Sequence, residues 1–424
     1  MLQYFIIGAS ASAVGAVEGI RSIDPMGRIT VISEESMAPY SRPSIGEYLD
    51  GRINDDSLRF GSADFWKLND VQILLKRKVV SIDLQSRTLQ LDDGESACFD
   101  KLLLATGAKP IVPKMLGIEK EGLCTFSNSM DIQKIREKLP ETHTSIVIGG
   151  GLIGIAAAES LVNLGIQVTV VELRDWMLNI LLDRDAAGIV ESAMRKRGVI
   201  IVTGKSVQEI NGKDSDDSKV GSVILSNGER LPCDLVVAAI GVVPRIELAI
   251  QAGLKVNRGI IVNRFMETSA PGVYACGDVA EAYDYLKENN QVLALWPLAR
   301  LGGKVAGLNM AGGNIEYPGG VPMSALRYFD VPLISVGINV QGNVGDYEIL
   351  SANSEHVYKK IILRREEVVG FTLVGDVKSG GLFNNLMKTR TKISQIKDKL
   401  LDPEFSFVNL PEPLRKKTLM EAWL

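Results

Sequence analysis

Residues 145–172 read SIVIGGGLIGIAAAESLVNLGIQVTVVE, and this stretch decides the fold. An apolar run leads into Gly149-x-Gly151-x-x-Gly154, a helix-like stretch of small and apolar residues follows, and a second apolar run ends in Glu172. The first glycine permits a tight turn, the second lets the backbone approach a pyrophosphate, and the third lets helix and strand pack closely. This order predicts a dinucleotide-binding unit with phosphates at the helix N-terminus.

A degenerate copy of the same unit is found near the N-terminus. Residues 4–7 supply the strand, Gly8 begins the turn, and Ser10 and Ala13 replace the second and third glycines. Serine and alanine are among the smallest side chains, so the approach of the backbone to a phosphate is narrowed but kept. The next apolar run, residues 28–35, ends in acids, as the second strand of such a unit does.

A secretory leader is the alternative for residues 4–20, because they are apolar and contain an A-x-A arrangement. A leader needs a positive segment before its apolar region, and residues 1–4 contain no Lys or Arg. The repeat of the unit around Gly149 therefore favours the nucleotide turn.

The composition narrows the class of protein. The 424 residues are 46% hydrophobic, the formal net charge is −4, and no apolar run reaches the ~18 residues of a membrane span. The charge gives no basic footprint for nucleic acid. The cysteines are few, far apart and without a metal or disulfide pattern, which favours a cytoplasmic protein without a metal site. They are Cys98, Cys124, Cys233 and Cys276.

Two further segments repeat one another. Residues 101–110, KLLLATGAKP, and residues 235–244, LVVAAIGVVP, each read as a buried strand ending in a tight turn, at Thr106-Gly107 and at Gly241. Each follows one of the glycine-turn units. The chain therefore contains a repeat at the level of whole domains, and it predicts two bound nucleotides.

With these motifs in order, the chain resembles the FAD- and NAD(P)-dependent pyridine nucleotide–disulfide oxidoreductase superfamily. Residues 268–281, TSAPGVYACGDVAE, resemble the second flavin motif, and residues 295–312 resemble the helix that follows it. The resemblance implies an α/β fold with two Rossmann-like (three-layer ββα) dinucleotide-binding domains plus a C-terminal α+β domain. The predicted ranges are 1–110 and 242–320 for a discontinuous FAD domain, 111–241 for an inserted NAD domain, and 321–424 for a C-terminal interface domain.

The resemblance also implies the cofactor-binding residues. Those expected for FAD are Gly8, Ser10, Ala13, Glu34, Arg42, Pro43, Val80, Ala105, Thr106, Gly107, Gly277, Asp278 and Trp296. Those expected for NAD are Gly149, Gly151, Leu152, Ile153, Gly154, Glu172 and Gly241. An acid at the position of Glu172 bonds the ribose 2′-OH of NAD and repels the 2′-phosphate of NADP, so NAD(H) is favoured, although Arg174 lies nearby.

The branch of the family is indicated by what residues 39–51, PYSRPSIGEYLDG, lack. Disulfide reductases carry C-x-x-x-x-C beside the flavin, and coenzyme A disulfide reductases and many NADH oxidases carry one Cys there. This segment has none, and neither His143 nor His356 lies in a motif. It resembles instead the Y-x-R-P-x-x-S-x-x-L segment of rubredoxin and ferredoxin reductases and of the flavin region of assimilatory nitrite reductases. Arg42 and Pro43 would line FAD, because the planar guanidinium suits a pyrophosphate.

Two departures concern ionisable groups. Many relatives have a Lys soon after the Arg-Pro, where Glu47 stands here, and a Glu two residues after the third glycine, where Ala156 stands. Glu159, one turn further on, is retained and is a candidate modulator. Because the cofactors carry hydride chemistry, no protein residue is expected to be catalytic.

The predicted activity is electron transfer between NAD(H) and a one-electron iron–sulfur partner. The chain has no C-x-x-C cluster, so the partner would be a rubredoxin or ferredoxin, or iron–sulfur subunits of a larger oxidoreductase complex with this chain as its NAD-facing subunit. The alternatives are a peroxide-forming NADH oxidase and, in another class, a non-catalytic flavin-binding structural subunit.

The C-terminal region leaves the quaternary state open, with a homodimer or hetero-oligomer as the options. Residues 371–390 resemble the sheet-then-helix of the C-terminal domain in rubredoxin-reductase relatives. In the last residues, apolar side chains recur at roughly helical spacing, so this end packs on its own domain or docks on another subunit. They are Leu414, Leu419, Met420, Trp423 and Leu424.

Overall fold

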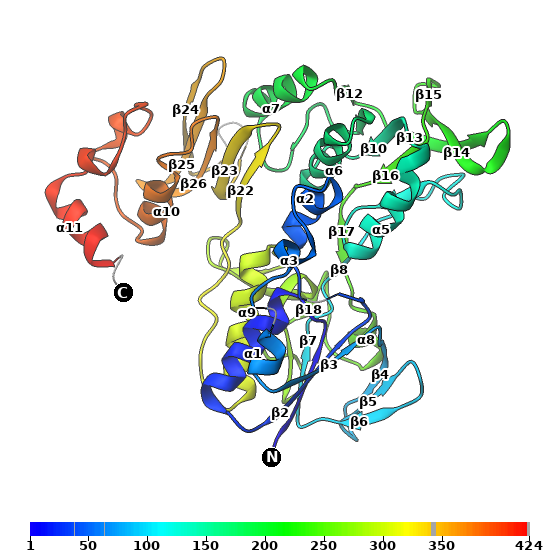
Figure 1. Cartoon of the computed structure of the whole chain (residues 1–424). Coiled ribbons are helices and arrows are strands. Elements are labelled where there is room, and N and C mark those ends of the chain that lie inside the picture. The colour runs from blue at the N-terminus through cyan, green and yellow to red at the C-terminus, as the bar shows by residue number, and fades with distance from the viewer. Residues whose placement is uncertain (38, 63, 341–344, 422–424) are drawn as a thin grey trace.

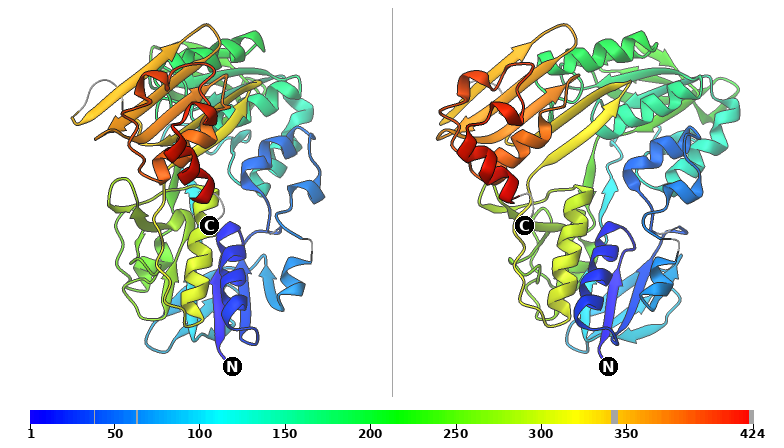
Figure 2. Two further views of the ribbon diagram at one scale, coloured as in Figure 1. Left: turned by 90° about the vertical axis from the view of Figure 1, so that its left-hand side faces the viewer. Right: turned by 60° about the vertical axis from the view of Figure 1, so that its left-hand side comes forward.

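The computed structural model describes residues 1–37, 39–62, 64–340 and 345–421, with only the backbone described for 417–421. The chain forms a T (Figure 1). The stem is built around the sheet that contains both the N-terminal strand and strand β19, and the two arms are formed by the middle of the chain and by its C-terminal part. Turning the molecule shows the C-terminal arm leaning over helix α9 of the stem (Figure 2).

The stem contains a five-stranded parallel sheet in the order β19-β7-β1-β2-β3. Its strands are β1 (Gln3–Ile7), β2 (Arg28–Ser33), β3 (Val71–Leu75), β7 (Lys101–Leu104) and β19 (Val273–Ala275). The helices of the stem are α1 (Ala11–Ile23), α3 (Asp55–Leu58), α4 (Phe65–Leu68), α8 (Glu247–Gln251) and α9 (Trp296–Met310). Two small sheets complete it, with strands β4 (Val79–Asp83), β5 (Thr88–Leu91) and β6 (Ser96–Cys98), and β18 (Ile260–Ile261), β20 (Ala280–Asp284) and β21 (Asn289–Gln291).

Helices α1 and α9 touch backbone to backbone. A Cβ added to Gly15 would lie 2.2 Å from the carbonyl oxygen of Arg300, and one added to Gly303 would lie 2.1 Å from that of Ser12. The same holds one turn further along each helix, at Gly19 and Gly307. Any side chain at these four positions would push the helices apart, so the glycines fix how close α9 lies to the N-terminal unit.

The second domain contains another five-stranded parallel sheet, in the order β12-β11-β10-β16-β9. Its strands are β9 (Leu123–Thr125), β10 (Thr144–Ile148), β11 (Gln167–Glu172), β12 (Ile200–Thr203) and β16 (Leu235–Ala238). Its helices are α5 (Ser129–Lys138), α6 (Leu152–Asn163) and α7 (Arg184–Lys196), and an antiparallel sheet is formed by β13 (Val207–Lys213), β14 (Asp216–Leu225) and β15 (Arg230–Pro232).

Two strands connect the stem to the second domain. β8 (Ala108–Pro110) leaves the stem and β17 (Val242–Pro244) returns to it, and the two pair antiparallel. They follow β7 and β16, the two strands that the repeated segments predict. The crossing of the chain at this place agrees with an insert, and the exact domain boundaries stay a proposal.

The C-terminal arm is an antiparallel sheet in the order β22-β23-β26-β25-β24, with helices against it. Its strands are β22 (Met323–Tyr328), β23 (Val331–Gly337), β24 (Tyr347–Asn353), β25 (Tyr358–Arg364) and β26 (Glu367–Val374), and its helices are α10 (Gly380–Lys388) and α11 (Glu412–Glu421). The sheet-then-helix expected for residues 371–390 is present as β26 and α10. In α11, Leu414 packs against the core of this domain. Trp423 and Leu424 lie outside the described residues.

The C-terminal domain is attached to the second domain by buried polar contacts. Lys360 Nζ, on a side chain only 3% exposed, lies 2.9 Å from Asp183 Oδ2, and the Tyr358 hydroxyl donates to the same oxygen at 2.5 Å. Asp183 also caps helix α7 by accepting the Ala186 N–H. The C-terminal domain is attached to the stem as well, because Leu286, in the turn between β20 and β21, is buried in the core of the C-terminal domain.

One segment packs where the sequence gives no indication. Tyr40, Ile45 and Leu58, which precede β3, belong to the same apolar core as helix α6 of the second domain. In α2 (Ile45–Leu49), Gly46 lies so close to α6 that an added Cβ would be 2.8 Å from Ser160 Oγ. The segment between β2 and β3 therefore bridges the two dinucleotide units. Among the described residues, no helix is both long and apolar enough to cross a membrane.

The buried ion pair predicts that Lys360→Met destabilises the junction between the second and third domains. The substitution keeps the length of the side chain but leaves Asp183 without its cation, a loss of about 3 kcal/mol when one partner of a buried pair is removed. Denaturant unfolding of the variant should show an earlier transition. Arg327→Met is the matched control, because its partner Asp330 is 75% exposed and such surface pairs contribute about 0–1 kcal/mol. Equal effects of the two substitutions would contradict the prediction.

Candidate cofactor sites

The two glycine turns have the same backbone geometry. Gly8 and Gly149 both have φ of +109°, and an added Cβ would lie 2.1 Å from the Ala105 carbonyl oxygen in the first turn and 2.4 Å from that of Ala239 in the second. Both positions combine a left-handed φ with close contact to the strand that ends beside the turn, which only glycine tolerates. The degenerate copy thus keeps the first glycine for the same reason as the complete one.

The second and third glycines of the complete turn, Gly151 and Gly154, have different roles, one toward a cofactor and one in internal packing. Gly151 has an ordinary φ of −81°, and a Cβ there would meet no described atom within 4 Å. A Cβ on Gly154 would lie 1.9 Å from the Gly149 carbonyl oxygen. Gly154 is therefore required by the packing of helix on strand, whereas no described residue requires a glycine at 151. A ligand that needs the backbone surface at Gly151 explains it, and a pyrophosphate fits that description.

Both turns lead into helices with open N-termini. α1 begins after Ser10 and α6 begins after Gly151, and neither N-cap residue makes a side-chain hydrogen bond to its helix. The first N–H groups of α6, in Leu152 and Ile153, therefore remain for an anion, as the sequence predicts. In the first unit, Ala13 is completely buried, so its methyl group fills the position of the third glycine.

Each unit has an acid at or directly after the end of its second strand, and the two carboxylates have different partners. Glu172, the last residue of β11, is 8% exposed and accepts the N–H groups of Gly150 at 2.6 Å and Arg174 at 2.8 Å. Glu34 follows β2 and forms an ion pair with Arg245. The backbone contacts point the Glu172 carboxylate back to its own glycine turn, where a ribose beside the pyrophosphate would lie.

Arg42 and Pro43 form a short 3-10 helix, η1 (Arg42–Ser44), between β2 and α2. The Arg42 guanidinium pairs with Glu35 and donates to the Ser127 carbonyl at 2.9 Å. Asp278 is close enough for the two charges to act on one another: burial raises the pKa of the Asp278 carboxyl, and the charge of Arg42 opposes that rise. Two residues predicted to meet FAD from 236 positions apart in the chain are thus brought together.

The start of α9 closes this site. Trp296 is the first residue of α9, its ring packs edge-on against Phe60 with centroids 4.3 Å apart, and its Nε1 is buried without a hydrogen-bond partner among the described residues. A Cβ on Gly277 would lie 2.4 Å from Ser12 Oγ in α1. An orphaned donor at the start of α9 fits a ligand with polar edges, and the residues present fit FAD.

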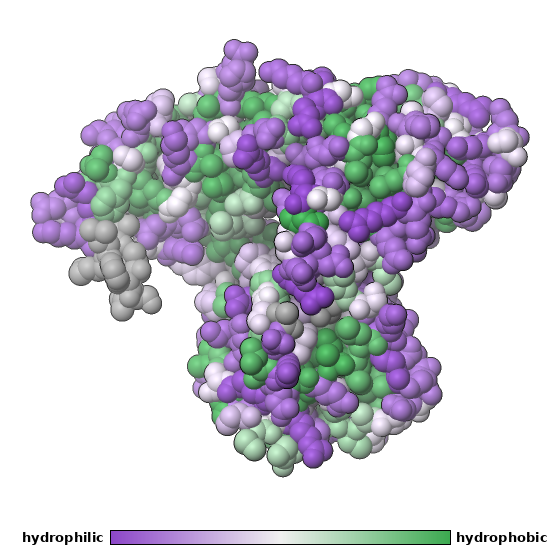
Figure 3. All heavy atoms as spheres, viewed as in Figure 1, coloured by the Kyte–Doolittle hydropathy of each residue, from purple (hydrophilic) through white to green (hydrophobic). Residues whose placement is uncertain are grey.

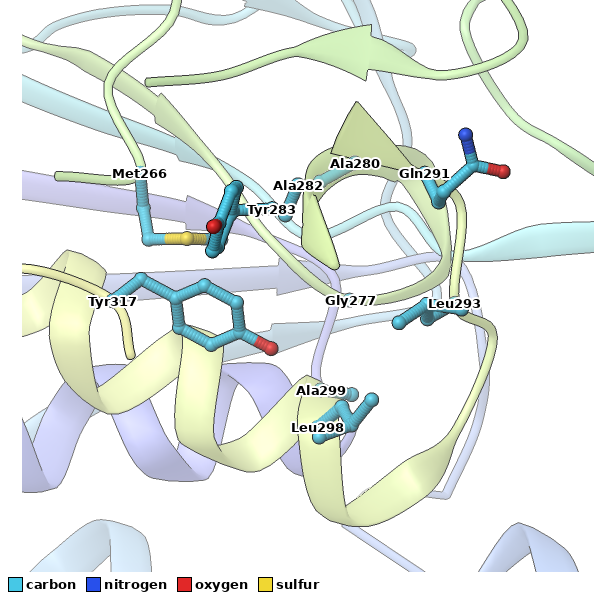
Figure 4. A pocket seen from close by; sticks show the side chains of 10 residues that line it. All are labelled: Met266, Gly277, Ala280, Ala282, Tyr283, Gln291, Leu293, Leu298, Ala299 and Tyr317. Carbon is cyan, nitrogen blue, oxygen red and sulfur yellow. The ribbon is translucent and has the colours of Figure 1, made fainter. Parts of the chain in front are cut away.

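A pocket adjoins this place, behind Gly277 (Figure 4). It lies between the first turn of α9 and the strands β20 and β21, and the side chains of Tyr317 and Leu293 enter it from opposite sides. Tyr283, Tyr317 and Gln291 bring polar groups to its lining, and the other lining residues are apolar or small.

The remaining predicted residues lie around the connection between the domains. Ala105, Thr106 and Gly107 follow β7, and a Cβ on Gly107 would meet no described atom within 4 Å. Gly241 precedes β17, and its carbonyl accepts the Ile111 N–H. Val80 lies apart from these, on β4 in the small antiparallel sheet, and is 39% exposed.

Glu159 points to the C-terminal domain. Its Oε1 accepts the Phe329 N–H at 2.6 Å, and burial raises the pKa of this carboxyl. One residue earlier, Tyr328 donates its hydroxyl to the Leu152 carbonyl, in the first turn of α6. Glu159 is therefore a contact between the nucleotide helix and the third domain, and this contact is the one that the structure offers for a modulating role.

The cysteines do not provide a thiol relay. Cys276 is completely buried beside Gly277, and burial raises the pKa of its thiol to about 12. Cys124 and Cys233 are buried as well, with pKa values raised by burial to about 11 and about 12. Cys98 is exposed, at the end of β6 in the small antiparallel sheet. No thiolate is available among the three buried groups at neutral pH.

Sequence reasoning missed three residues of these sites. Phe60 contacts the Trp296 ring, and Ser12, in α1, contacts Gly277. Neither of them is among the predicted cofactor-binding residues. Arg245 pairs with Glu34, although the inserted domain lies between the two residues in the sequence. A basic residue directly after the GVVP segment is the only signal in the sequence, and it lies 211 positions from its partner.

Comparison with known proteins agrees with this geometry. The family model for pyridine nucleotide-disulphide oxidoreductases matches residues 2–303, and the model for the rubredoxin NAD+ reductase C-terminal domain matches residues 322–391. The α/β fold predicted from the sequence is confirmed. A solved structure, a NAD-dependent persulfide reductase from A. fulgidus, superposes with a TM-score of 0.86 at 29% identity, over 99% of this chain and 83% of the other.

Two curated relatives cover most of the chain. The epsilon subunit of NADH-dependent phenylglyoxylate dehydrogenase from Aromatoleum evansii is 30% identical over 99% of this chain and 98% of its own length. The nitrite reductase [NAD(P)H] of Bacillus subtilis is 29% identical over 93% of this chain, and the chain spans about half (48%) of that relative.

The different roles of the glycines give a test of the second turn. Gly151→Ala should fold with unchanged thermal stability, because its Cβ meets no protein atom, but it should raise the KM for NADH about tenfold, as expected for an obstructing methyl at a close contact. Gly154→Ala is the matched control. Its Cβ collides with the Gly149 carbonyl, so it should lower thermal stability whether or not NADH is present. A normal KM for NADH in the Gly151→Ala protein would show that the pyrophosphate does not bind at this surface.

Proposed function

The chain belongs to the pyridine nucleotide-disulphide oxidoreductase family and is an FAD- and NAD(H)-dependent oxidoreductase, and we propose that it passes electrons between NAD(H) and an iron–sulfur partner. In this proposal the partner is a set of iron–sulfur subunits of a larger oxidoreductase, with this chain as the subunit that meets NAD(H). A separate rubredoxin or ferredoxin is the other form of the same proposal. The direction of electron flow is left open.

The similarity to the epsilon subunit of an NADH-dependent dehydrogenase carries the proposal, because it extends over 99% of this chain and 98% of the relative. That relative is by its name one subunit of a larger enzyme. The present chain has the same extent and contains no cysteine cluster for an iron–sulfur centre of its own. In this proposal the one-electron carrier is held by a partner subunit.

The residues have separate tasks in this reaction. Bound FAD supplies the conversion between the two-electron chemistry of NADH and one-electron transfer. Gly151 and the start of α6 bind the NADH pyrophosphate, and Glu172 orients the adenosine ribose and disfavours a 2′-phosphate. Arg42 and Asp278 would hold FAD, the other cofactor. None of these groups gives or takes a proton in the hydride step.

The absence of an available thiol separates this proposal from sulfur chemistry. The A. fulgidus structure is that of a persulfide reductase, but no described cysteine lies at the flavin site with an exposed thiol. We therefore do not extend persulfide reduction to this chain. Location in the cytoplasm is part of the proposal, since an exposed free thiol such as Cys98 persists in a reducing compartment.

Thiol independence is directly measurable. Treating the holoprotein with iodoacetamide should change NADH oxidation with ferricyanide by less than about twofold, because a thiol whose pKa lies far above neutral is hardly ionised and does not react. Cys98 should be the only residue that is alkylated, which peptide mapping shows. Loss of turnover in step with alkylation would contradict the mechanism.

The nature of the acceptor is tested with purified holoprotein under anaerobic conditions. NADH should bleach the flavin within the time of mixing, and a ferredoxin or rubredoxin should then restore its colour. In air, oxygen uptake should account for only a small part of NADH consumption. Uptake that matches NADH one to one with release of peroxide would instead establish the NADH oxidase, and a flavin that NADH does not bleach would establish the non-catalytic subunit. Purification from the native source should yield iron in a copurifying subunit.

A further inference from the structure

An arginine that follows the returning strand β17 pairs with an acid of the first unit. Arg245 directly follows β17, and its guanidinium forms an ion pair with Glu34. Its backbone is fixed on both sides, because its N–H donates to the Gly107 carbonyl at 3.0 Å and its carbonyl accepts the Thr106 hydroxyl at 3.1 Å. The side chain thus has a fixed origin next to three residues predicted to bind FAD.

The bonding of this guanidinium is incomplete. Nη1 serves Glu34, whereas Nε is buried without a hydrogen-bond partner among the described residues. A buried donor of a charged group without a partner is costly, so a partner from outside the chain is expected at this place. The side chain of Arg245 is 32% exposed and that of Glu34 is 36% exposed, so both are accessible to a ligand.

The second unit shows what is special about this pair. There Glu172, the last residue of β11, accepts two backbone N–H groups and pairs with no described guanidinium. In the first unit the register position of Glu172 is taken by Ser33, and the acid Glu34 comes one residue later. In the first unit the acid would lie beside a diphosphate with nothing from its own turn to hold it. A carboxylate next to a diphosphate is repelled unless its charge is balanced. Arg245 supplies that balance from 211 residues away.

From these contacts we propose that Arg245 is a positioning residue of the FAD site. Its guanidinium holds the Glu34 carboxylate toward the ribose of the adenosine and offsets its charge beside the diphosphate. The inference concerns the binding of FAD and is independent of which partner exchanges electrons with the protein. It also makes the returning connection, β17, part of the FAD site.

The test is the affinity for FAD, measured by the fluorescence of FAD released from diluted holoprotein and by its rebinding. Arg245→Gln should weaken FAD binding at least about tenfold, the range for loss of one charge-assisted bond. Because the harm comes from an unbalanced carboxylate, the double variant Arg245→Gln with Glu34→Gln should bind FAD more tightly than Arg245→Gln alone. A pair that serves only folding would leave the FAD affinity of the folded variants unchanged instead.

A second ion pair on the same connection provides the control. Lys109, in β8, pairs with Glu247, and both side chains are about half exposed. Lys109→Gln removes a cation from this connection without touching Glu34, so it should leave the affinity for FAD unchanged. The thermal stability of the FAD-free proteins should be similar for wild type, Arg245→Gln and Lys109→Gln.

The outcomes decide between positioning and general stability. Wild-type affinity in Arg245→Gln, an equal loss in Lys109→Gln, or additivity in the double variant would overturn the proposal. Should Arg245→Gln fail to fold, Arg245→Lys carries the test. This variant keeps the charge but not the planar fork of the guanidinium, so it should weaken FAD binding by a smaller factor than Arg245→Gln does. In a protein that also carries Glu34→Gln, Arg245→Lys should cause no further loss of FAD affinity. A factor that persists there would overturn the proposal as well.

Discussion

Close approach of one backbone to another is the constraint on which the rest of this structure depends. Glycine in a helix interior costs about 0.5–1 kcal/mol relative to alanine, yet α1 and α9 each carry two glycines at the contact between them. The cost is offset because any Cβ there would collide with a carbonyl oxygen of the other helix. With α9 held against α1, Gly277 comes to lie on Ser12, and the short 3-10 helix that bears Asp278, η3 (Gly277–Val279), meets the start of α1. The FAD site is assembled by this contact between segments almost 300 residues apart.

Much of this arrangement follows from local patterns in the sequence. The complete glycine turn, its degenerate copy and the two strands that end in tight turns predict both parallel sheets and the double connection between them. They succeed because each depends on residues near one another in the chain: a positive φ at Gly149, a short helix–strand distance at Gly154, an acid after a buried strand. The glycine at 151, which the protein's own packing does not require, was the local sign of a ligand.

What the sequence did not predict depends on contacts between distant segments. Arg245 and Glu34 are 211 residues apart, and no periodicity couples them. Likewise, residues 40–58 read as part of the first unit but share a core with α6 of the second, because Gly46 allows α2 to lie against Ser160. The attachment of the C-terminal domain was also hidden. Part of it is the buried pair made by Lys360, which lies in a strand of two lysines followed by an apolar run and gives no sign in the sequence that its charge is buried.

The third domain ties the other two together. It receives Leu286 from the stem into its apolar core, and it grips the second domain through Asp183 and through helix α6. Tyr328 and Glu159 connect it to the helix whose first turn is expected to bind the NADH pyrophosphate. The surface is hollowed where this arm meets the stem, and apolar residues gather on the arm above the hollow (Figure 3). The third domain, which contributes no predicted cofactor ligand, therefore contacts both of the domains that are expected to bind nucleotides.

The two departures from the family pattern, at Glu47 and Ala156, agree with a protein that positions its cofactors and leaves the chemistry to them. Glu47 is exposed on α2, and Ala156 lies where α2 and α6 meet, so the junction between the domains has neither a lysine nor a glutamate of the expected kind. Both ionisable groups that the resemblance implies for this place are therefore missing. Hydride transfer between two bound cofactors survives these losses, since it needs their separation and orientation and the exclusion of water. The protein's contribution is thus geometric, and the choice of electron partner has to be made by its surface.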